Sequence, residues 1–286
     1  MNATPTVFIL VLNYNGRATI LSCLRSLFHL DYSNFKVIFI DNASTDGSFE
    51  IVKQQYSYVH CIRNSENVGF ARGINVGIRF ALDHGADFVW LMNPDAEPQR
   101  GALSRLVALF LKHPRVGVVS PLVLTPSRKV WFGGGMIHRS RMRAVHVPMR
   151  SRTIPFETGF VSGCAMMIRS TVFRSIGLLD ERFFLYYEDA DFSLRAKRAG
   201  FRVVVHPKIH TIHSEESRHN KAWKTYWLVR SGLFFFRKHT PFLLHSVFWM
   251  TFLARWGRSS VRAMRDDDEE TLAVQEAFRD FWRYGY

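Results

Sequence analysis

Hydrophobic residues in the first hundred positions come in short uninterrupted runs that alternate with helical patterns. TVFILVLN, FKVIFID and DFVWLM are runs typical of buried strands. The segments RATILSCLRSLFHL and ARGINVGIRFALDHG lie between such runs and place apolar residues at helical spacing. Strands that alternate with helices predict a parallel sheet, and uninterrupted apolar strands predict that helices cover both of its faces. We therefore expect an α/β fold.

Each of these three apolar runs ends in polar residues, namely Asn13 and Asn15, Asp41, and Asn93 and Asp95. A proline between the last two ends the third run, because proline lacks a backbone N–H and restricts the residue before it. One polar strand end is usually a surface turn. Parallel strands, however, place their carboxyl ends on one edge of the sheet, where ligands bind. Three polar strand ends on one edge therefore favour a binding site.

The second half of the chain has a less regular pattern. Residues 120–160 contain many loop-forming and basic residues and few periodic signals. The segment GFVSGCAMMIRSTVFRSIG predicts a strand followed by a helix, and a further helix is expected from about Asp189 to Ala199, with Gly200 as its cap. The run FRVVV after this glycine predicts another strand.

Three acidic residues, Glu188, Asp189 and Asp191, lie at the start of the helix in YYEDADFSLR. Acids at this position often serve only as helix caps. Aromatic residues directly precede them, and a carboxylate in a partly apolar cleft has the raised pKa that suits a general base. Both interpretations are open on the sequence alone.

Two histidines, His210 and His213, follow the predicted strand FRVVV. Either one could bring an imidazole to the carboxylates of the sheet edge, and the spacing does not distinguish them. A lone histidine is more often structural than a ligand, but a site rich in oxygen ligands is already half assembled here.

The chain is strongly basic, with a formal net charge of +14 and an isoelectric point near 10.1. Such a charge implies an anionic partner, for example phosphate-bearing substrates, an acidic membrane surface or nucleic acid. No acidic residue occurs between Glu216 and Asp266, where lysine and arginine alternate with aromatic residues in two predicted helices. These helices are too short in their apolar parts to span a bilayer, which takes about 20 residues.

The same helices therefore either lie on a membrane surface or form a helical cap whose aromatic side chains make a core. The acidic run DDDEE at 266–270 is expected to open a last short helix. Three scattered cysteines without a CxxC pair favour a reducing compartment, and the N-terminus lacks the pattern of a signal peptide. We therefore expect a cytoplasmic protein.

Five segments, in chain order, carry a family resemblance: VLNYNGRATILSCLRSL, VIFIDNASTDGS, NSENVGFARGINVGI, LMNPDAE and GLLDERFFLYYEDADFSLRAKRAGFRV. Together they resemble family 2 glycosyltransferases with the GT-A fold, closest to the bacterial rhamnosyltransferase-like branch, over about residues 6–240. The resemblance implies a catalytic domain at 1–220, with a nucleotide-sugar half up to about 120 and an acceptor half after it. The basic, aromatic-rich helices of 221–286 would then serve membrane-surface or oligomer contacts.

The resemblance also implies an inverting reaction in which an acceptor hydroxyl displaces the diphosphate of a dTDP-rhamnose-like or UDP-sugar donor. The acceptor would be a lipid-linked or cell-envelope glycan at the inner face of the cytoplasmic membrane, and Mg²⁺ or Mn²⁺ would bind the diphosphate. The implied roles are the catalytic base for Asp189, acceptor binding for Glu188 and Asp191, nucleotide-sugar binding for Asn13, Asn15, Asp41, Arg72 and Asn93, and metal binding for Asp95 and His213.

One residue departs from the family pattern. Asn93 takes the place of the first acid of the metal-binding DxD motif. An amide oxygen coordinates a metal without adding charge, so we expect weaker metal affinity or a greater dependence on the diphosphate.

Two other classes of protein were weighed against this interpretation. A nucleic-acid binder would explain the basic charge and the aromatic residues, but it leaves carboxylates at three strand ends that would repel phosphates. A nucleotide-dependent dehydrogenase is disfavoured, because the glycines in NVGFARGINVG do not have the GxGxxG spacing. We therefore expect no nucleic-acid partner.

Overall fold

The computed structural model describes residues 4–148, 152–214, 221–263 and 268–284. The chain divides into two compact units. Unit 1 consists of Met1–Met136, Val145–Glu181 and Glu188–Glu216, and unit 2 consists of Ile137–Ala144, Arg182–Tyr187 and Ser217–Tyr286.

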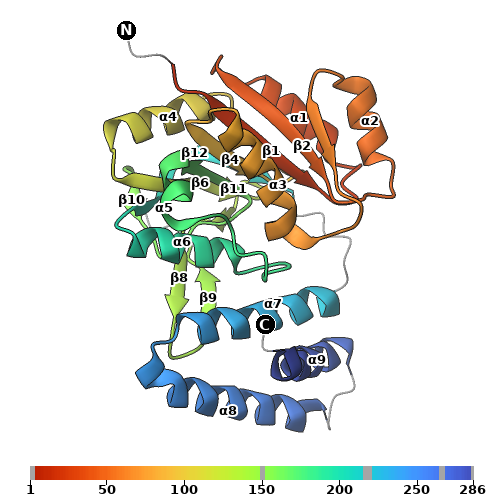
Figure 1. Ribbon diagram of the computed structural model, residues 1–286, viewed down its shortest axis with the longest axis vertical. Helices are drawn as coiled ribbons and strands as arrows, with labels where there is room; N and C mark the ends of the chain where they lie inside the picture. The colour runs from red at the N-terminus through yellow and green to blue at the C-terminus, as the bar shows by residue number, and fades with distance from the viewer. Residues whose placement is uncertain (1–3, 149–151, 215–220, 264–267, 285–286) are drawn as a thin grey trace. The chain divides into compact units, whose positions relative to one another are not determined.

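A ten-stranded sheet forms the centre of unit 1 (Figure 1). The strand β1 (Val7–Asn13) pairs in parallel with β2 (Phe35–Asp41) on one side and with β4 (Phe88–Met92) on the other. The strand β3 (His60–Arg63) continues this parallel set beyond β2. The predicted parallel sheet is thus confirmed for the first half of the chain.

The other half of the sheet is mixed. The strand β11 (Ala165–Arg169) runs antiparallel to β4 and to β6 (Val116–Leu124). The strand β12 (Arg202–His213) lies parallel to β6, and β10 (Phe156–Glu157) lies antiparallel to β12. All residues of β1, β4 and β6 are buried, as expected for strands covered on both faces.

Helices cover both faces of the parallel strands because of the order of the connections. The helices α1 (Ile20–Phe28) and α2 (Ser48–Gln55) belong to crossovers that move from β1 to β2 to β3. The helix α3 (Gly69–Asp83) belongs to the crossover that returns to β4 on the other side of β1. Right-handed crossovers therefore put α3 on the face opposite to α1 and α2, and Figure 1 shows α3 in front of the strands. Gly77 allows this close packing, because a Cβ there would lie 2.4 Å from Ile40 Cδ1.

The remaining elements of unit 1 include structure that the sequence pattern did not predict. The helices are α4 (Ala102–Lys112), α5 (Ser170–Ile176) and α6 (Glu188–Arg198). The short strands β5 (Ala96–Pro98) and β7 (Val130–Phe132) pair with β12 and β6. A separate two-stranded sheet joins β8 (Gly135–His138) to β9 (Arg143–His146). The segment 120–160 is therefore richer in strands than expected.

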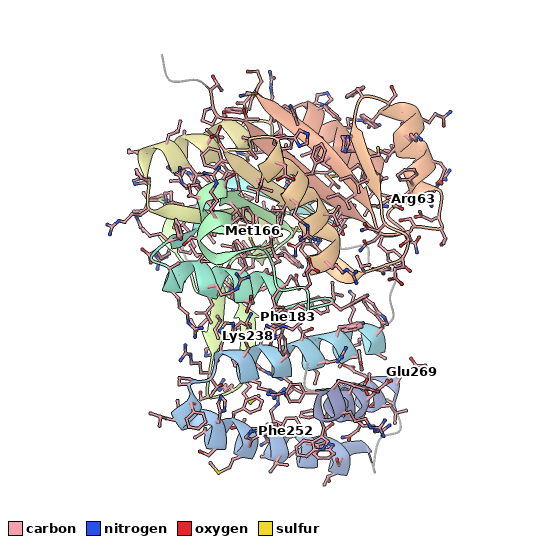
Figure 2. All side chains as sticks on the ribbon, viewed as in Figure 1. Arg63, Met166, Phe183, Lys238, Phe252 and Glu269 are labelled. Atoms are coloured by element: carbon pink, nitrogen blue, oxygen red, sulfur yellow. The ribbon has the colours of Figure 1, made fainter. Side chains whose placement is uncertain are left out.

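Unit 2 is mainly helical. It contains α7 (Lys221–His239), the short 3₁₀ helix η1 (Phe242–Leu244), α8 (His245–Ala263) and α9 (Glu269–Tyr284). Phe252 of α8 lies at its centre, with its ring centroid 5.1 Å from that of Phe278 (Figure 2). The last helix has 16 residues and is longer than expected, while residues 266 and 267 of the acidic run lie outside the described residues. Within the described part of the chain, no helix has the length and hydrophobicity needed to cross a membrane.

Candidate functional site

The parallel strands bring their polar ends together, as the sequence predicted. Asn13 ends β1 and lies directly opposite Asp41, the last residue of β2. Its buried Nδ2 lies 3.0 Å from Asp41 Oδ1, 3.0 Å from Ser44 Oγ and 2.8 Å from Ser48 Oγ. These four residues, Asn13, Asp41, Ser44 and Ser48, form a network that we call the closed cluster.

Asp41 is fully buried, and the chain itself occupies its carboxylate. Its Oδ1 accepts from Asn13, and its Oδ2 accepts from the backbone N–H of Ser44 at 2.9 Å. The guanidinium Nε of Arg63 lies 3.6 Å from the same Oδ2. Asp41 thus fixes the loop between β2 and α2. Its binding of the base or ribose stays a prediction.

Arg63 is a residue that the sequence analysis missed. It ends β3 and also donates to Glu50 Oε1 and to the backbone carbonyl of Ser44, each at 3.0 Å (Figure 2). Its guanidinium lies 4.6 Å from the ring centroid of Phe49. The available signal was its place at the end of a fourth strand, beside three strand ends that had already been noted.

Asn15 and Arg72 lie at the same edge of the sheet. Asn15 has a φ of 52°, in the left-handed region that asparagine tolerates, and its Oδ1 accepts from the backbone N–H of Thr45 at 2.8 Å. Arg72 is exposed in the first turn of α3. The next residue, Gly73, packs so closely that a Cβ there would lie 2.8 Å from Asn42 Oδ1. The start of α3 therefore lies over the ends of β1 and β2.

A second group of polar residues is assembled by pairing between distant segments. The strand β5 pairs antiparallel with β12, so that His213 lies opposite Ala96. The backbone N–H of Ser214 also donates to the carbonyl of Asp95 at 3.0 Å. As a result, His213 Nε2 lies 3.2 Å from Asp95 Oδ1. The strand FRVVV thus continues to His213, and the structure places His213 rather than His210 beside Asp95.

The arrangement of Asp95 and His213 fits a divalent cation. Asp95 Oδ1 and His213 Nδ1 are buried and have no hydrogen-bond partner in the described structure, so the short distance between the two side chains is not a hydrogen bond. Two ligands on adjacent corners of an octahedron with bonds of about 2.1 Å lie about 3 Å apart. No group of three or more His, Cys, Asp or Glu able to hold a metal occurs among the described residues. A cation here would therefore need further ligands from phosphate or water, as Mg²⁺ commonly does.

Asn93 connects this corner to the predicted catalytic acid. Its backbone N–H donates to the carbonyl of Cys164 at 2.9 Å. Gly163, which precedes Cys164, donates its N–H to Asp189 Oδ2 at 3.0 Å. Two backbone contacts thus join the end of β4 to the start of α6. The structure brings Asn93 and Asp189 into one neighbourhood.

Asp189 is held by hydrogen bonds near the start of α6. Its Oδ1 accepts from the backbone N–H of Ala190 at 2.7 Å, in addition to the contact with Gly163. Burial raises the pKa of Asp189, and the two N–H donors and the nearby His146 only partly offset this effect. A carboxylate with a raised pKa is a stronger base, so this position suits proton abstraction.

Glu188 is a second acid with an unusual environment. Burial raises its pKa well above the ordinary value, and the charges of Asp189 and Asp191 raise it further. Its Oε2 is buried without a hydrogen-bond partner in the described structure. The raised pKa shifts the side chain of Glu188 towards its neutral form, and a neutral carboxyl can donate a hydrogen bond. We call Asp95, His213, Glu188 and Asp189 the open cluster.

The backbone before Glu188 adopts a strained conformation. Tyr186 and Tyr187 both have φ angles of 67°. The left-handed region is uncommon for bulky residues, and such strain tends to occur at functional sites. Two consecutive cases directly before Glu188 and Asp189 mark this turn as a site of function.

Asp191 differs from its acidic neighbours. It is fully buried, and its Oδ2 lies 2.7 Å from Arg195 Nε. Arg195 also donates to the carbonyls of Ile176 and Leu178 at 2.7 and 2.8 Å. The bonds from Arg195 to these two carbonyls tie α6 to the end of α5. Binding of the acceptor by Asp191 stays a prediction.

Two aromatic residues near the site were also missed by the sequence analysis. The ring of Trp131 lies 4.4 Å from that of His213 and 4.8 Å from that of His146. His146 in turn acts electrostatically on Asp189. These two rings therefore extend from His213, the predicted metal ligand, to Asp189, the predicted catalytic base. No sequence signal pointed to them, because both lie in the segment expected to be loop.

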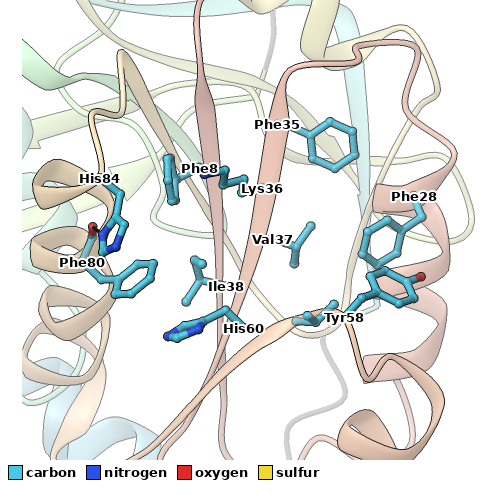
Figure 3. Close-up of a pocket in the computed structure, with 11 residues that line it drawn as sticks. Phe8, Phe28, Phe35, Lys36, Val37, Ile38, Tyr58, His60, Phe80 and His84 are labelled. Carbon is cyan, nitrogen blue, oxygen red and sulfur yellow. Dashed lines mark hydrogen bonds between the residues drawn. The ribbon is translucent and has the colours of Figure 1, made fainter.

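A well-formed pocket elsewhere in unit 1 does not belong to this site. It has a volume of about 280 Å³ and is lined by Phe8 and by residues of the first half of β2, with Phe28, Tyr58, His60 and Phe80 around them (Figure 3). Phe8 and the lining residues of β2 belong to the beginnings of their strands, whereas the closed cluster lies at the ends of β1 and β2. Its largely apolar lining offers little to a diphosphate, so we place the chemistry at the carboxyl edge.

Comparison with known proteins identifies the family of the chain. The profile of "Glycosyl transferase family 2" matches residues 8–177. The "N-acetylglucosaminyl-diphospho-decaprenol L-rhamnosyltransferase" of Mycobacterium tuberculosis is 30% identical over 256 residues, which are 80% of this chain and 81% of that protein. The "dTDP-rhamnosyl transferase RfbF" of Shigella flexneri is 23% identical over 83% of this chain and 82% of that protein.

Solved structures show the same fold at low identity. GalNAc-T7 with UDP, GalNAc and Mn²⁺ matches 80% of this chain with a TM-score of 0.66 and 17% identity, and the match spans 48% of that chain. The mannosyltransferase PcManGT from Pyrobaculum calidifontis with GDP-Man and Mn²⁺ matches the whole chain with a TM-score of 0.63 and 18% identity, over 77% of that chain. The predicted GT-A fold is therefore confirmed. The chain belongs to glycosyl transferase family 2, and it is a hexosyltransferase that uses a nucleotide-sugar donor.

Proposed function

We propose that the protein is an inverting, metal-dependent glycosyltransferase that moves a sugar from a dTDP-rhamnose-like or UDP-sugar donor to a hydroxyl of a lipid-linked or cell-envelope glycan. The names of the two rhamnosyltransferase relatives support this donor and acceptor class. The observation that carries the proposal is the open cluster. In it, Asp95 and His213, two side chains of the kind that binds metals, meet Asp189, a base of raised pKa, at the carboxyl edge of one sheet.

Asp95 and His213 are the residues that would hold Mg²⁺ or Mn²⁺. Such a cation acts as a Lewis acid that neutralises the charge of a leaving diphosphate. Asn93 adds a neutral amide oxygen at the same turn. The exposed guanidinium of Arg72 at the start of α3 suits the donor's phosphates, because its planar fork matches phosphate oxygens. Asn13 and Asn15 shape the edge against which the nucleotide lies.

Asp189 takes the proton from the acceptor hydroxyl as the new bond to the sugar forms and the bond to the diphosphate breaks. This single displacement inverts the configuration of the sugar. The raised pKa of Asp189 makes it a better base than an ordinary aspartate. Neutral Glu188 lies beside it and is placed to donate a hydrogen bond to the acceptor.

We further propose that residues 1–220 form the catalytic domain and that the helices of 221–286 meet an anionic membrane surface on the cytoplasmic side. The stretch between Glu216 and Asp266 has basic but no acidic residues, and several apolar side chains of η1 and α8 are exposed. Basic helices with apolar faces bind such surfaces.

A panel of nucleotide sugars tests this function. Each donor is incubated with the protein and a lipid-linked acceptor, with Mg²⁺ or Mn²⁺ or with a chelator, and released nucleoside diphosphate and glycosylated lipid are measured. We expect one donor to be turned over only when the metal is present. Turnover that persists undiminished in chelator would contradict the proposed metal dependence. A lack of product with every donor would overturn the proposed reaction.

A further inference from the structure

Unit 2 contains a pocket of about 420 Å³ in which three arginines converge. Arg143 comes from β9, and Arg255 and Arg258 come from α8. The wall opposite them belongs to α9 and includes Thr271, Val274 and Phe278. We call Arg143, Arg255 and Arg258 the arginine pocket.

The lining of this pocket carries three arginines and one carboxylate, Glu270. Arg255 is half-buried, and its Nη1 donates to the carbonyl of Met142 at 3.1 Å. Burial lowers its pKa, and the neighbouring charges of Arg143 and Arg258 lower it further. The carboxylate in the lining, Glu270, is already paired with Lys221 Nζ at 2.5 Å. Like charges drawn together in this way favour binding of an anion.

The chemistry of the pocket points to a phosphate. Guanidinium groups present planar pairs of N–H donors that match the oxygens of phosphate. Arg143 and Arg258 are exposed, so their donors are accessible to a ligand. The half-buried Arg255 keeps a fixed position through its bond to Met142. Two mobile guanidinium groups around a fixed one are suited to a tetrahedral anion.

The surroundings of the pocket point to a phosphate that is carried by a lipid. Phe242 and Leu243 of η1 are 84% and 88% exposed, and Val247 and Met250 of α8 continue the exposed apolar surface. Leu243, Val247 and Met250 are spaced as on one side of a helix. An apolar stripe on the helix that also carries Arg255 and Arg258 is the pattern of a helix lying in a membrane interface.

We propose that the arginine pocket binds the phosphate group of an anionic membrane lipid while the apolar stripe of α8 enters the membrane interface. The inference rests on the proposed function in one respect, namely that the protein works at a membrane surface. It adds a defined binding site to that surface.

Vesicle binding tests the pocket. The probes are vesicles of a neutral, phosphate-free galactolipid that contain either phosphatidylglycerol or oleate at equal surface charge. The double variant Arg143→Gln and Arg258→Gln is compared with wild type, and the double variant Arg279→Gln and Arg283→Gln is the control, because it removes the same charge from exposed positions of α9. Arginines that hydrogen-bond one phosphate contribute more than a general surface charge does, so the pocket variant should bind phosphatidylglycerol vesicles at least about tenfold more weakly.

The proposal requires that this loss be selective. Wild type and control should bind phosphatidylglycerol vesicles alike, and the pocket variant should bind oleate vesicles nearly as well as the control does. An equal loss on both vesicle types, or an equal loss in the control, would reduce the effect to general charge and overturn the phosphate site. Calorimetry with inorganic phosphate provides a second arm. If phosphate binds wild type but not the pocket variant while vesicle binding is unchanged, the site serves a soluble anion and the lipid is excluded.

Failure of this inference can be separated from failure of the proposed function. Donor hydrolysis without vesicles should be the same in wild type and in the pocket variant. The variant Asp189→Asn should lose sugar transfer but keep its binding to phosphatidylglycerol vesicles. Vesicle binding that survives when no donor is turned over would leave the pocket standing and overturn only the reaction.

Discussion

The closed cluster at the ends of β1 and β2 and the open cluster around β5, β12 and α6 occupy the same sheet but treat their buried polar atoms differently. In the closed cluster, Asn13 Nδ2 and both oxygens of Asp41 have partners within the chain. Asn13 Oδ1 has none and lies close to Gly16, where an added Cβ would be 2.3 Å from this oxygen.

In the open cluster, polar atoms of Asp95, His213 and Glu188 are buried without hydrogen-bond partners in the described structure. Buried polar atoms are costly unless they are satisfied. A satisfied network stabilises the fold, whereas an unsatisfied one is retained where a ligand or a reaction needs it. The comparison therefore predicts that changes in the closed cluster reduce stability and that changes in the open cluster reduce activity.

The largest effect is expected for Asp189→Asn. Loss of a general base lowers kcat by about 10²–10⁴-fold. Steady-state sugar transfer measures this loss, and donor binding by calorimetry should stay unchanged. The exposed acid of Asp83→Asn serves as the control, because that change removes a carboxylate from the surface of α3. A variant of Asp189 that keeps full kcat would contradict the assignment of the base.

The next effect concerns the predicted metal ligands, Asp95 and His213. His213→Ala should weaken metal-dependent donor binding by at least about tenfold, since changes even in outer-shell partners of metal sites cost about 10–100-fold. His210→Ala is the matched control, because His210 lies on the same strand but not beside Asp95. Calorimetric titration with donor in Mn²⁺ measures both. Equal losses in the two variants would mean that β12, and not the imidazole of His213, is responsible.

A change in the closed cluster should act on stability. Asn13→Ala removes the donor that joins Asp41, Ser44 and Ser48, and an unsatisfied buried polar group costs about 1–3 kcal/mol. Urea unfolding gives the free energy of unfolding. The half-buried Asn34, which donates to Thr6 Oγ1, provides the control variant Asn34→Ala with a smaller loss. If Asn13→Ala is as stable as wild type, the closed cluster has no structural role.

The smallest effect is a pH dependence of stability. The pKa of Glu188 is raised in the folded protein, so the folded state holds the proton over a range where the unfolded state has released it. This contribution is therefore fully present below the ordinary glutamate pKa of 4.5 and is lost as the pH rises toward the raised value. Glu188→Gln should flatten this decline in the free energy of unfolding, measured in chelator. An unchanged slope would place the titration elsewhere.

Much of the nucleotide side of the molecule could be predicted because its signals are local. Apolar strands that end in Asn13, Asp41 and Asn93 are visible in the sequence, and parallel pairing then fixes where their ends lie. The intrachain partners of Asp41 could not be predicted, because they depend on the loop at Ser44 and on Arg63 at the end of β3. Periodicity carries no information on such side-chain contacts.

The other half of the site depends on pairing between segments far apart in the sequence. The length of β12 and its register with β5 decide that His213, not His210, lies at Asp95. A register shift between His206 and His210 lets the strand continue past the point where the sequence pattern ends. The ion pair of Asp191 with Arg195 spans one turn of α6, so its i,i+4 spacing was a local signal in the sequence that separates Asp191 from Asp189. The bonds from Arg195 to the carbonyls of Ile176 and Leu178 were not visible there, because they depend on how α6 packs against α5.

Uptake of Mn²⁺ by the open cluster tests the central claim most directly. Free Mn²⁺ gives an electron paramagnetic resonance signal that is lost when the ion binds to protein. We predict that wild-type protein with a nucleoside diphosphate removes this signal and that Asp95→Asn protein does so only at much higher concentration, because the buried oxygen that faces His213 loses its charge. Equal Mn²⁺ uptake by the Asp95→Asn variant and by wild type would contradict the account.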